Sequence, residues 1–153
     1  MPYWLMKTEP DTFSIDDLAN MPDQTTIWDG VRNYQARNYI RDKIKIDDNI
    51  LIYHSSCRNI GIVGWATVVR DAYPDPTQFD PSSRYYDPKA TEENPRWFSV
   101  DVKFNNKFNQ LVSLATLKDI DGLKALPLVK KGSRLSVMPV SNSEWKIINA
   151  LAN

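Results

Sequence analysis

Two side-chain types that carry much of protein chemistry are almost missing from this sequence of 153 residues, which has one cysteine and one histidine. The single cysteine, Cys57, excludes an intrachain disulfide and a zinc site built from several cysteines. The single histidine, His54, removes the usual metal sites with two or more imidazole ligands. The sequence also has no phosphate-cradling glycine-rich loop and no dinucleotide fingerprint. We therefore expect no metal and no cofactor.

Net charge and long apolar runs are absent too. Lysine plus arginine and aspartate plus glutamate number 19 each, so the formal net charge is zero. A neutral molecule does not attract polyanions as a whole, which leaves room only for a local basic patch. No apolar run approaches the length of a membrane span, and the N-terminus lacks the regions of a signal peptide. We expect an intracellular, cytoplasmic protein with no membrane partner.

The residues over 28–41, which read WDGVRNYQARNYIR, combine aromatic rings, amides and arginines. An Asp-Gly turn is followed by a helix, and Arg37 and Arg41 share one of its faces. The apolar stripe of this helix, which should face a core, consists of Ala36, Ile40 and Ile44. Forked guanidiniums, amides and rings are groups that bind phosphates and planar bases. The alternative is a surface helix whose arginines serve only as caps and in pairs.

Alternating apolar and polar residues predict a sheet with short helices inserted between its strands. Strands are expected over residues 2–8, 49–55, 61–70, 97–112 and 134–140. Further helices are expected over 14–20, 114–120 and 141–151. The irregular segment over residues 71–95 is rich in proline and aromatic rings, and connections of this length are commonly functional. Together these elements predict a single α+β domain over residues 1–153 with a barrel-like sheet.

Three clusters of polar residues could carry chemistry. Lys7, Thr8 and Glu9 end the first strand, where a barrel mouth would open, although a solvated charge pair is the alternative. His54 and Ser55 are neighbours on a strand and point to opposite faces, which disfavours a base–nucleophile pair. Hydrogen bonding in a pocket is therefore favoured there over catalysis. The third cluster, suited to backbone phosphates, consists of Lys130, Lys131 and Arg134.

Six segments, in order along nearly the whole chain, carry a resemblance to a known family. They are MKTEPDTFS from residue 6, WDGVRNYQARN from residue 28, YHSSC from residue 53, GIVGWATVV from residue 61, AYPDPTQFD from residue 72 and RLSVMPVS from residue 134. On these segments the chain resembles the EVE domain family. The resemblance implies a PUA-like fold, an α+β mixed-sheet pseudo-barrel flanked by short helices, related to the YTH domains that read methylated adenine in RNA. It further implies a reader of modified bases that is not an enzyme.

The similarity to YTH domains implies roles for individual residues. Lys7-Thr8 and Trp28 match positions beside the aromatic cage, so Trp28 would stack on the base and Thr8 or Ser55 would bond its edge. The candidates to complete the cage are Tyr73, Tyr85, Tyr86 and Trp97. The residues assigned to the base pocket are Lys7, Thr8, Glu9, Trp28, Asn33, Tyr34, His54, Ser55, Tyr73 and Ser136. Those assigned to flanking phosphates are Arg32, Arg37, Arg41, Lys130, Lys131 and Arg134.

The expected partner is DNA or RNA that carries a modified base, with a cytosine derivative favoured, and the expected binding unit is a monomer. Two alternatives stay open. One is a base-modification hydrolase of the related ASCH type, which would use Lys7, Glu9 and His54. The other is a module that binds proteins or small molecules without catalysis.

Overall fold

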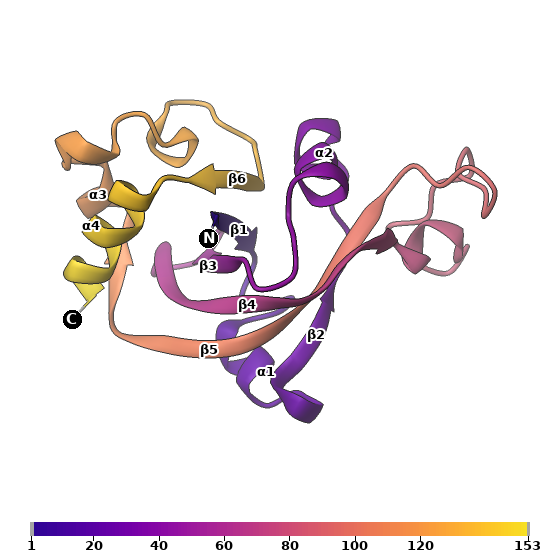
Figure 1. The fold of residues 1–153 in the computed structure, drawn as a ribbon, viewed down its shortest axis with the longest axis horizontal. Helices are drawn as coiled ribbons and strands as arrows, with labels where there is room; N and C mark the ends of the chain where they lie inside the picture. Colours follow the sequence, from indigo (N-terminus) through magenta and orange to yellow (C-terminus); the bar gives the residue numbers. More distant parts are fainter. Residues whose placement is uncertain (1, 153) are drawn as a thin grey trace.

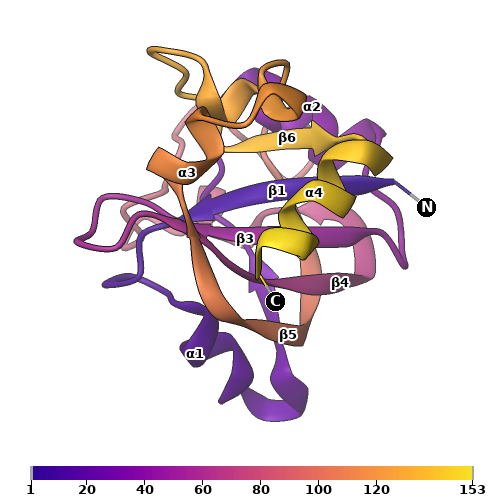
Figure 2. The same ribbon diagram turned by 90° about the vertical axis from the view of Figure 1, so that its left-hand side faces the viewer.

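One mixed sheet of six strands organises the chain, whose computed structural model describes residues 2–152. The strand order is β2-β5-β4-β3-β1-β6, and Figure 2 shows the strands from β6 to β5 one below another. The strands are β1 (Tyr3–Thr8), β2 (Thr25–Trp28), β3 (Asn49–His54), β4 (Gly61–Pro74), β5 (Phe98–Ser113) and β6 (Val137–Val140). The helices are α1 (Ile15–Ala19), α2 (Tyr34–Asp42), α3 (Leu114–Lys118) and α4 (Asn142–Ala152).

The central strands β1 and β3 run parallel, while the other pairings of these six strands are antiparallel. Thr8, the last residue of β1, lies opposite His54, the last residue of β3. Parallel strands end at the same edge of a sheet. The residues that follow, Glu9 and Ser55, therefore emerge together, and the Ser55 N–H donates to the Thr8 carbonyl at 2.9 Å.

The long strands β4 and β5 bend the sheet. Their pairing contains four register shifts, one of them between Ile62 and Gly64. Bulges of this kind increase the local twist and bend a strand. Figure 1 shows the two strands curving together beneath β1 and β3. The sheet nevertheless stays open, with β2 and β6 as its edges. The predicted α+β mixed sheet flanked by short helices is confirmed as a curved sheet that does not close.

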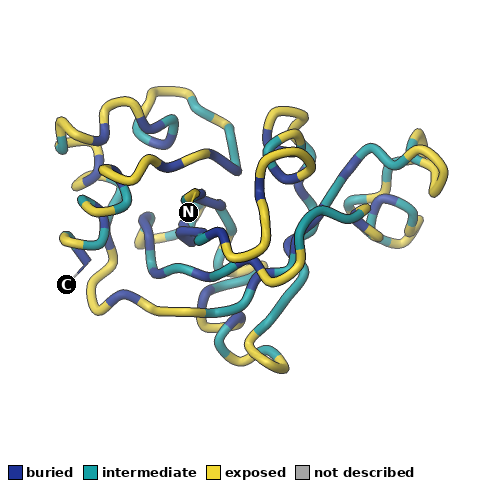
Figure 3. The backbone as a smooth tube through the Cα atoms, viewed as in Figure 1, coloured by how far each residue is buried: buried dark blue, intermediate teal, exposed yellow. Residues whose placement is uncertain are grey.

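Successive residues of β1 point into two different cores, as the alternation predicts. Trp4 and Met6 belong to the cluster that receives α1 and α2, whereas Leu5 belongs to the cluster that receives α3 and α4. Figure 1 shows α3 and α4 together at one end of the sheet, with α1 and α2 nearer the long connection between β4 and β5. Figure 3 shows the buried backbone concentrated in the central strands and this connection as largely exposed.

Helix α2 confirms the apolar stripe expected after Trp28. Ala36, Ile40 and Ile44 have no exposed surface. The helix begins at Tyr34 because Asn33 acts as its N-cap, with the Asn33 side-chain oxygen accepting from the Ala36 N–H at 2.9 Å. Side-chain caps satisfy the donors that the first turn leaves unpaired. Packing and capping thus fix the direction in which the helix leaves the turn.

Three strands differ from the sequence-based expectation: β6 only begins later, at Val137 instead of residue 134, and the differences at β2 and β4 are larger. The pattern does not predict β2, because a run of four residues is too short for its alternation to be recognised. Strand β4 continues past the expected end at Arg70, since its bulged pairing with β5 extends to Tyr73 opposite Ser99 and Pro74 opposite Phe98. Both larger differences matter for function, because β2 leads directly into the turn at Asp29 and β4 into the long connection.

The close approach of β5 to Gly64 generates a stability prediction. An added Cβ would lie 2.2 Å from the Asn106 carbonyl oxygen and 2.4 Å from Ile15 Cδ1. Because the carbonyl belongs to the paired strand and cannot swing away, Gly64→Ala should lower the free energy of unfolding by roughly 1–3 kcal/mol. Urea denaturation measures the loss.

The matched control is Gly122→Ala, whose Cβ would meet only the end of the Ile147 side chain, at 2.6 Å. A flexible side-chain end can move, so this variant should unfold close to the wild-type midpoint. Equal midpoints for both variants would contradict the assigned approach of β5 to Gly64.

Candidate functional site

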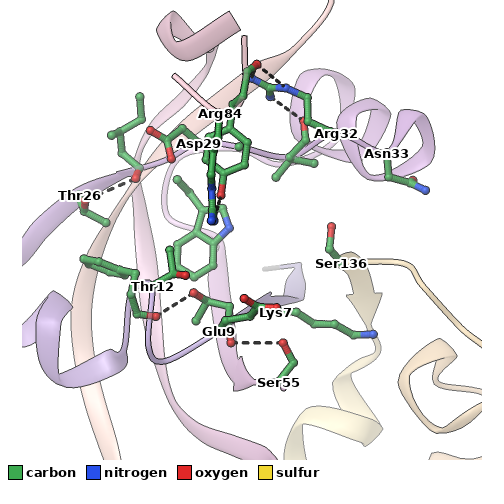
Figure 4. Close-up of a pocket in the computed structure, with 17 residues that line it drawn as sticks. Lys7, Glu9, Thr12, Thr26, Asp29, Arg32, Asn33, Ser55, Arg84 and Ser136 are labelled. Carbon is green, nitrogen blue, oxygen red and sulfur yellow. Dashed lines mark hydrogen bonds between the residues drawn. The ribbon is translucent and has the colours of Figure 1, made fainter. Parts of the chain in front are cut away.

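A cavity of about 610 Å³ opens at the edge where β1, β2 and β3 end. Segments that follow these strands form one wall, the residue before β6 forms another, and the long connection between β4 and β5 closes the top (Figure 4). The lining residues are Lys7, Thr8, Glu9, Thr12, Phe13, Thr26, Ile27, Trp28, Asp29, Gly30, Val31, Arg32, Asn33, Ser55, Arg84, Tyr85 and Ser136. Most residues assigned to the base pocket from the sequence are brought together here.

Hydrogen bonds to backbone carbonyls hold three polar residues at the floor of the cavity. The Lys7 N–H donates to the Ser136 carbonyl at 2.9 Å, which fixes the segment before β6 against β1. The Thr8 hydroxyl donates to the Phe13 carbonyl at 2.8 Å and is therefore already engaged. The Ser55 hydroxyl makes only a long contact of 3.5 Å with the Thr8 carbonyl. Figure 4 shows the Ser136 hydroxyl pointing toward Arg32 and Asn33 across the opening.

The turn after β2 is anchored by one buried carboxylate. Gly30 has a φ of 77°, a conformation that favours glycine. Its N–H donates to Asp75 Oδ2 at 2.8 Å, across 45 positions of sequence. The ring of Tyr85 lies where a Cβ would be, with its Cζ atom at 2.6 Å from that position. Glycine at residue 30 therefore lets an aromatic ring pack directly on the backbone of the turn.

Arg32 ties the same turn to the long connection. Its guanidinium donates to Asp75 Oδ2 at 3.0 Å, to Thr77 Oγ1 at 3.0 Å and to the Tyr85 carbonyl at 2.8 Å. A side chain with this many internal acceptors has few donors left for a ligand. Arg32 therefore has a structural role at the cavity wall, and its binding of a phosphate stays a prediction.

Aromatic rings form two parts of the cavity wall. Trp28, with 8% of its surface exposed, lines the cavity and also packs in the core shared with α1 and α2. Tyr85 comes from the long connection and is half-buried. Arg84 lies over the Tyr85 ring, 4.8 Å from its centroid, and donates to its hydroxyl at 2.6 Å. Figure 4 shows Arg84 reaching into the cavity from the connection.

Four charged residues of the lining, Lys7, Glu9, Asp29 and Arg84, have no ion-pair partner among residues 2–152, and two of them, Lys7 and Asp29, have a pKa shifted by burial. The Lys7 ammonium lies 5.9 Å from the Tyr53 ring centroid, and burial lowers the pKa of this lysine. Burial, reinforced by the nearby Asp75 carboxylate, raises the pKa of Asp29. Half-buried charges without ion pairs are costly, and such perturbed groups cluster at functional sites.

His54 does not line the cavity, which corrects its assignment to the base pocket. Its Nε2 atom accepts a hydrogen bond from the Ile15 N–H at 3.1 Å, so the ring faces the start of α1. Burial lowers the pKa of His54 and favours the neutral ring that can accept this bond. The alternation along β3 correctly separates His54 from Ser55, and it is Ser55 that faces the cavity.

Tyr34 and Tyr73 also lie outside the cavity lining. Tyr34 stacks on Trp97, with ring centroids 4.8 Å apart, and Arg96 donates to its hydroxyl at 2.6 Å. The Tyr73 hydroxyl donates to Asp101 at the far end of β4, where burial and this bond raise the pKa of Tyr73 to about 12. Of the four candidates for the cage, Tyr85 is the one that lines the cavity.

The arginines of α2 are bound to internal acceptors. Arg37 donates to the Arg96 carbonyl at 2.8 Å, and Arg41 pairs with Asp42 at 2.8 Å. Arg41 thus pairs with a neighbouring acid at the surface, whereas Arg37 binds a carbonyl 59 positions away, and phosphate binding by either residue stays a prediction. The remaining cations assigned to phosphates lie exposed in the segment before β6, and they are Lys130, Lys131 and Arg134.

Two lining residues that sequence reasoning does not single out, Asp29 and Arg84, contribute charge to the cavity. Asp29 lies inside a segment that carries the family resemblance, but an Asp-Gly pair indicates only a turn. Arg84 lies in the irregular connection, where no periodicity indicates which side chains point inward. The family resemblance over residues 28–38 is therefore the one signal in the sequence that could have indicated Asp29, and no such signal indicates Arg84.

An open mixed sheet whose strand ends surround an aromatic-walled cavity defines a binding domain with the PUA-like architecture. The chain belongs to the EVE domain family, whose profile matches residues 2–151. This confirms the family and the fold class inferred from the six sequence segments.

The relatives of this chain include proteins from animals and bacteria. Thymocyte nuclear protein 1 of Rattus norvegicus is 43% identical over 166 residues, covering 97% of this chain and 73% of the rat protein. A crystal structure from Pseudomonas putida has a TM-score of 0.95 and 51% identity, and covers 99% of both chains. A crystal structure of human THYN1 in complex with DNA containing 5-methylcytosine has a TM-score of 0.95 and 39% identity, covering 100% of this chain and 98% of the human one.

An ASCH protein from Zymomonas mobilis shares the fold at a distance. Its structure matches with a TM-score of 0.58 and 11% identity over 99% of both chains. Similarity at this level relates the architectures only and does not transfer an activity. The hydrolase alternative therefore draws no support from the fold.

The raised pKa of Asp29 generates a prediction on pH. Because the folded protein binds the Asp29 proton more tightly than the unfolded chain does, the folded state is penalised once pH exceeds the folded pKa. Asp29→Asn should therefore raise the melting temperature at about pH 7, and the gain should disappear at about pH 3, where both states are protonated. Thermal unfolding at the two pH values measures the effect.

The control is Asp11→Asn, a change at an exposed carboxylate of the segment that follows β1. Surface substitutions of this kind usually leave stability nearly unchanged. A gain for Asp29→Asn that persists at the acidic pH would show that ionisation of Asp29 is not its cause.

Proposed function

We propose that this protein binds one modified cytosine of DNA in the cavity described above and leaves it chemically unchanged. The observation that carries the proposal is the match, over the whole chain, to human THYN1 in complex with DNA containing 5-methylcytosine. The cavity itself adds support, because its volume of about 610 Å³ lies within the range typical of ligand pockets.

The wall chemistry suits a planar base taken out of the stack. Proteins that read a single base extrude it and hold it by stacking and by hydrogen bonds to its edge. In the proposal Trp28 and Tyr85 supply the faces, and the hydroxyls of Ser55 and Ser136 bond polar atoms at the edge. The Asp29 carboxylate would accept from the exocyclic amino group, the contact by which acidic side chains recognise cytosine. Thymine presents an acceptor at that position and would be disfavoured.

Binding without chemistry is supported by the engagement of His54, the single histidine. The Nε2 lone pair of His54 already accepts from the Ile15 backbone, so it is unavailable as a general base. Lys7 and Glu9 line the cavity, but Glu9 is exposed after the end of β1. These contacts support a reader over the hydrolase alternative.

Three further predictions accompany the proposal. We expect that the protein can also bind RNA with a modified base, that it binds as a monomer, and that it is located in the cytoplasm. No helix within residues 2–152 is long and apolar enough to cross a membrane.

Stacking in the cavity is tested at Tyr85. Tyr85→Ala removes a ring of the wall while keeping the carbonyl that receives Arg32, so the local structure should survive. Loss of a stacking partner costs about 1–3 kcal/mol per base, which predicts an affinity for 5-methylcytosine DNA lower by roughly one to two decades. Fluorescence anisotropy with a labelled single-stranded oligonucleotide, modified or unmodified, measures the change.

The neighbouring Tyr86 provides the matched control. It is 41% exposed and does not line the cavity, so Tyr86→Ala should bind like the wild type. Trp28→Ala should lose both binding and stability, because Trp28 belongs to the core as well. If Tyr85→Ala keeps full affinity, the base does not stack on this wall.

The absence of catalysis is tested by mass spectrometry of the oligonucleotide after incubation with the protein. Oligonucleotides with a modified cytosine should leave prolonged incubation with unchanged mass and no released base or ammonia, as in samples without protein. Product that forms with the wild type but not with Glu9→Gln or His54→Ala would establish an enzyme and overturn this part of the proposal.

A further inference from the structure

A second cavity, of about 670 Å³, lies directly beside the first. It opens where β3 ends and is closed by α3 and by the segment before β6. The two cavities share Lys7 and Ser55. The lining residues of the second cavity are Lys7, Tyr53, Ser55, Ser56, Ile60, Leu114, Lys118, Leu128, Val129, Lys130, Lys131, Gly132 and Ser133. The two cavities are therefore neighbours, with Lys7 and Ser55 at their common border.

The charge of the second cavity has one sign. Its lining includes four lysines and no aspartate or glutamate, and these lysines are Lys7, Lys118, Lys130 and Lys131. The ion pairs found within residues 2–152 use other cations, namely Arg32, Arg41, Arg96, Lys103 and Lys107. Positive charges that no carboxylate neutralises attract an anion, and clefts lined by one sign of charge concentrate the attraction.

The floor of the second cavity is apolar. Leu128 and Tyr53 are buried, and Ile60, Leu114 and Val129 are partly buried against the same core. A free inorganic anion would gain nothing from such a surface. A nucleotide would, because its sugar and base offer apolar faces while its phosphate meets the lysines.

The backbone presents Lys130 and Lys131 at the rim. A 3-10 turn over Pro127–Val129 precedes them and is anchored by the buried Leu128. Gly132, with a φ of 76°, then reverses the chain, and the Ser133 N–H donates to the Lys130 carbonyl at 3.3 Å. The two ammonium groups thus project from a tight turn whose base is held in the core.

We infer that the second cavity is the binding site for the nucleotide next to the modified one, with its phosphodiester on the lysine rim and its sugar and base on the apolar floor. The inference rests on the proposed function, because the first cavity holds the modified base. It also sets the course of the strand, which leaves the base pocket past Lys7 and Ser55 toward α3. The inferred course does not use the arginine face of α2, where Arg37 donates to the Arg96 carbonyl and Arg41 forms an exposed ion pair with Asp42.

A charge-neutralisation experiment tests the site. The variant is Lys130→Ala with Lys131→Ala, and the ligands are short single-stranded oligonucleotides with one central 5-methylcytosine. In two of them a neutral methylphosphonate replaces the phosphate on the 5′ or the 3′ side of that base. The matched control removes the same charge with Lys43→Ala and Lys45→Ala, two exposed lysines at the opposite end of β3.

The contributions of the lysine pair and of one flanking phosphate to the affinity should not be additive. For the wild type, the methylphosphonate on one side only should weaken binding, and in the Lys130 and Lys131 variant it should have no further effect. The dependence of log affinity on log salt should shrink by about 0.7 for each phosphate that the variant no longer neutralises. The control variant should keep the wild-type response. The free nucleoside 5-methyl-2′-deoxycytidine, which has no phosphate, should bind both variants and the wild type equally.

Other outcomes separate this inference from the proposed function. If the Lys130 and Lys131 variant and the Lys43 and Lys45 control lose equal affinity, the second site is overturned while base reading stays intact. The same holds if the loss of affinity in the Lys130 and Lys131 variant simply adds to the loss caused by each methylphosphonate. Equal affinity of the wild type for oligonucleotides with and without the 5-methyl group would overturn base reading. The comparison of lysine variants and methylphosphonates, repeated on unmodified DNA, would then still test the second site. Failure of the wild type to bind any of these oligonucleotides would overturn both.

Discussion

The carboxylate of Asp75, which has no exposed surface, joins the two walls of the base cavity. One of its oxygens accepts from Gly30 and Arg32, and the other accepts from the backbone and hydroxyl of Thr77. A buried carboxylate is tolerated only when its lone pairs are used in this way. Gly30 and Arg32 belong to the turn after β2, whereas Thr77 belongs to the long connection. The position of Tyr85 over the turn depends on this link.

Lys7 and Asp29 differ from Asp75 because they have no ion-pair partner among residues 2–152. Within residues 2–152 every buried side-chain polar atom has a hydrogen-bond partner, so the fold itself is internally satisfied. Lys7 and Asp29 are half-buried charges without ion pairs, and both face the cavity. Their cost to stability is consistent with groups kept for a ligand, since binding sites often retain strain that folding alone would remove.

The sequence predicts the residues at the strand ends better than those in the connections. The expectation that Lys7 and Ser55 belong to a pocket rests on their places at strand ends, which are local features, and the expectation for Trp28 rests on the similarity to YTH domains. All three line the cavity. The assignment of His54 to the pocket is wrong, because the same alternation turns its ring to the other face, toward α1. Alternation tells which face a side chain takes, but not which element covers that face.

The amino-acid sequence by itself determined the helices and, except for β2, the strands around the site, together with the apolar stripe of α2 and the family. These depend on periodicities and motifs that act over a few neighbouring residues. Only the tertiary structure decided that Tyr85 lines the cavity while Tyr73 does not, and that Arg32 is paired with Asp75. Such partners lie more than forty positions apart. They meet because the parallel pairing of β1 with β3 and the bend of β4 bring distant segments to one edge of the sheet.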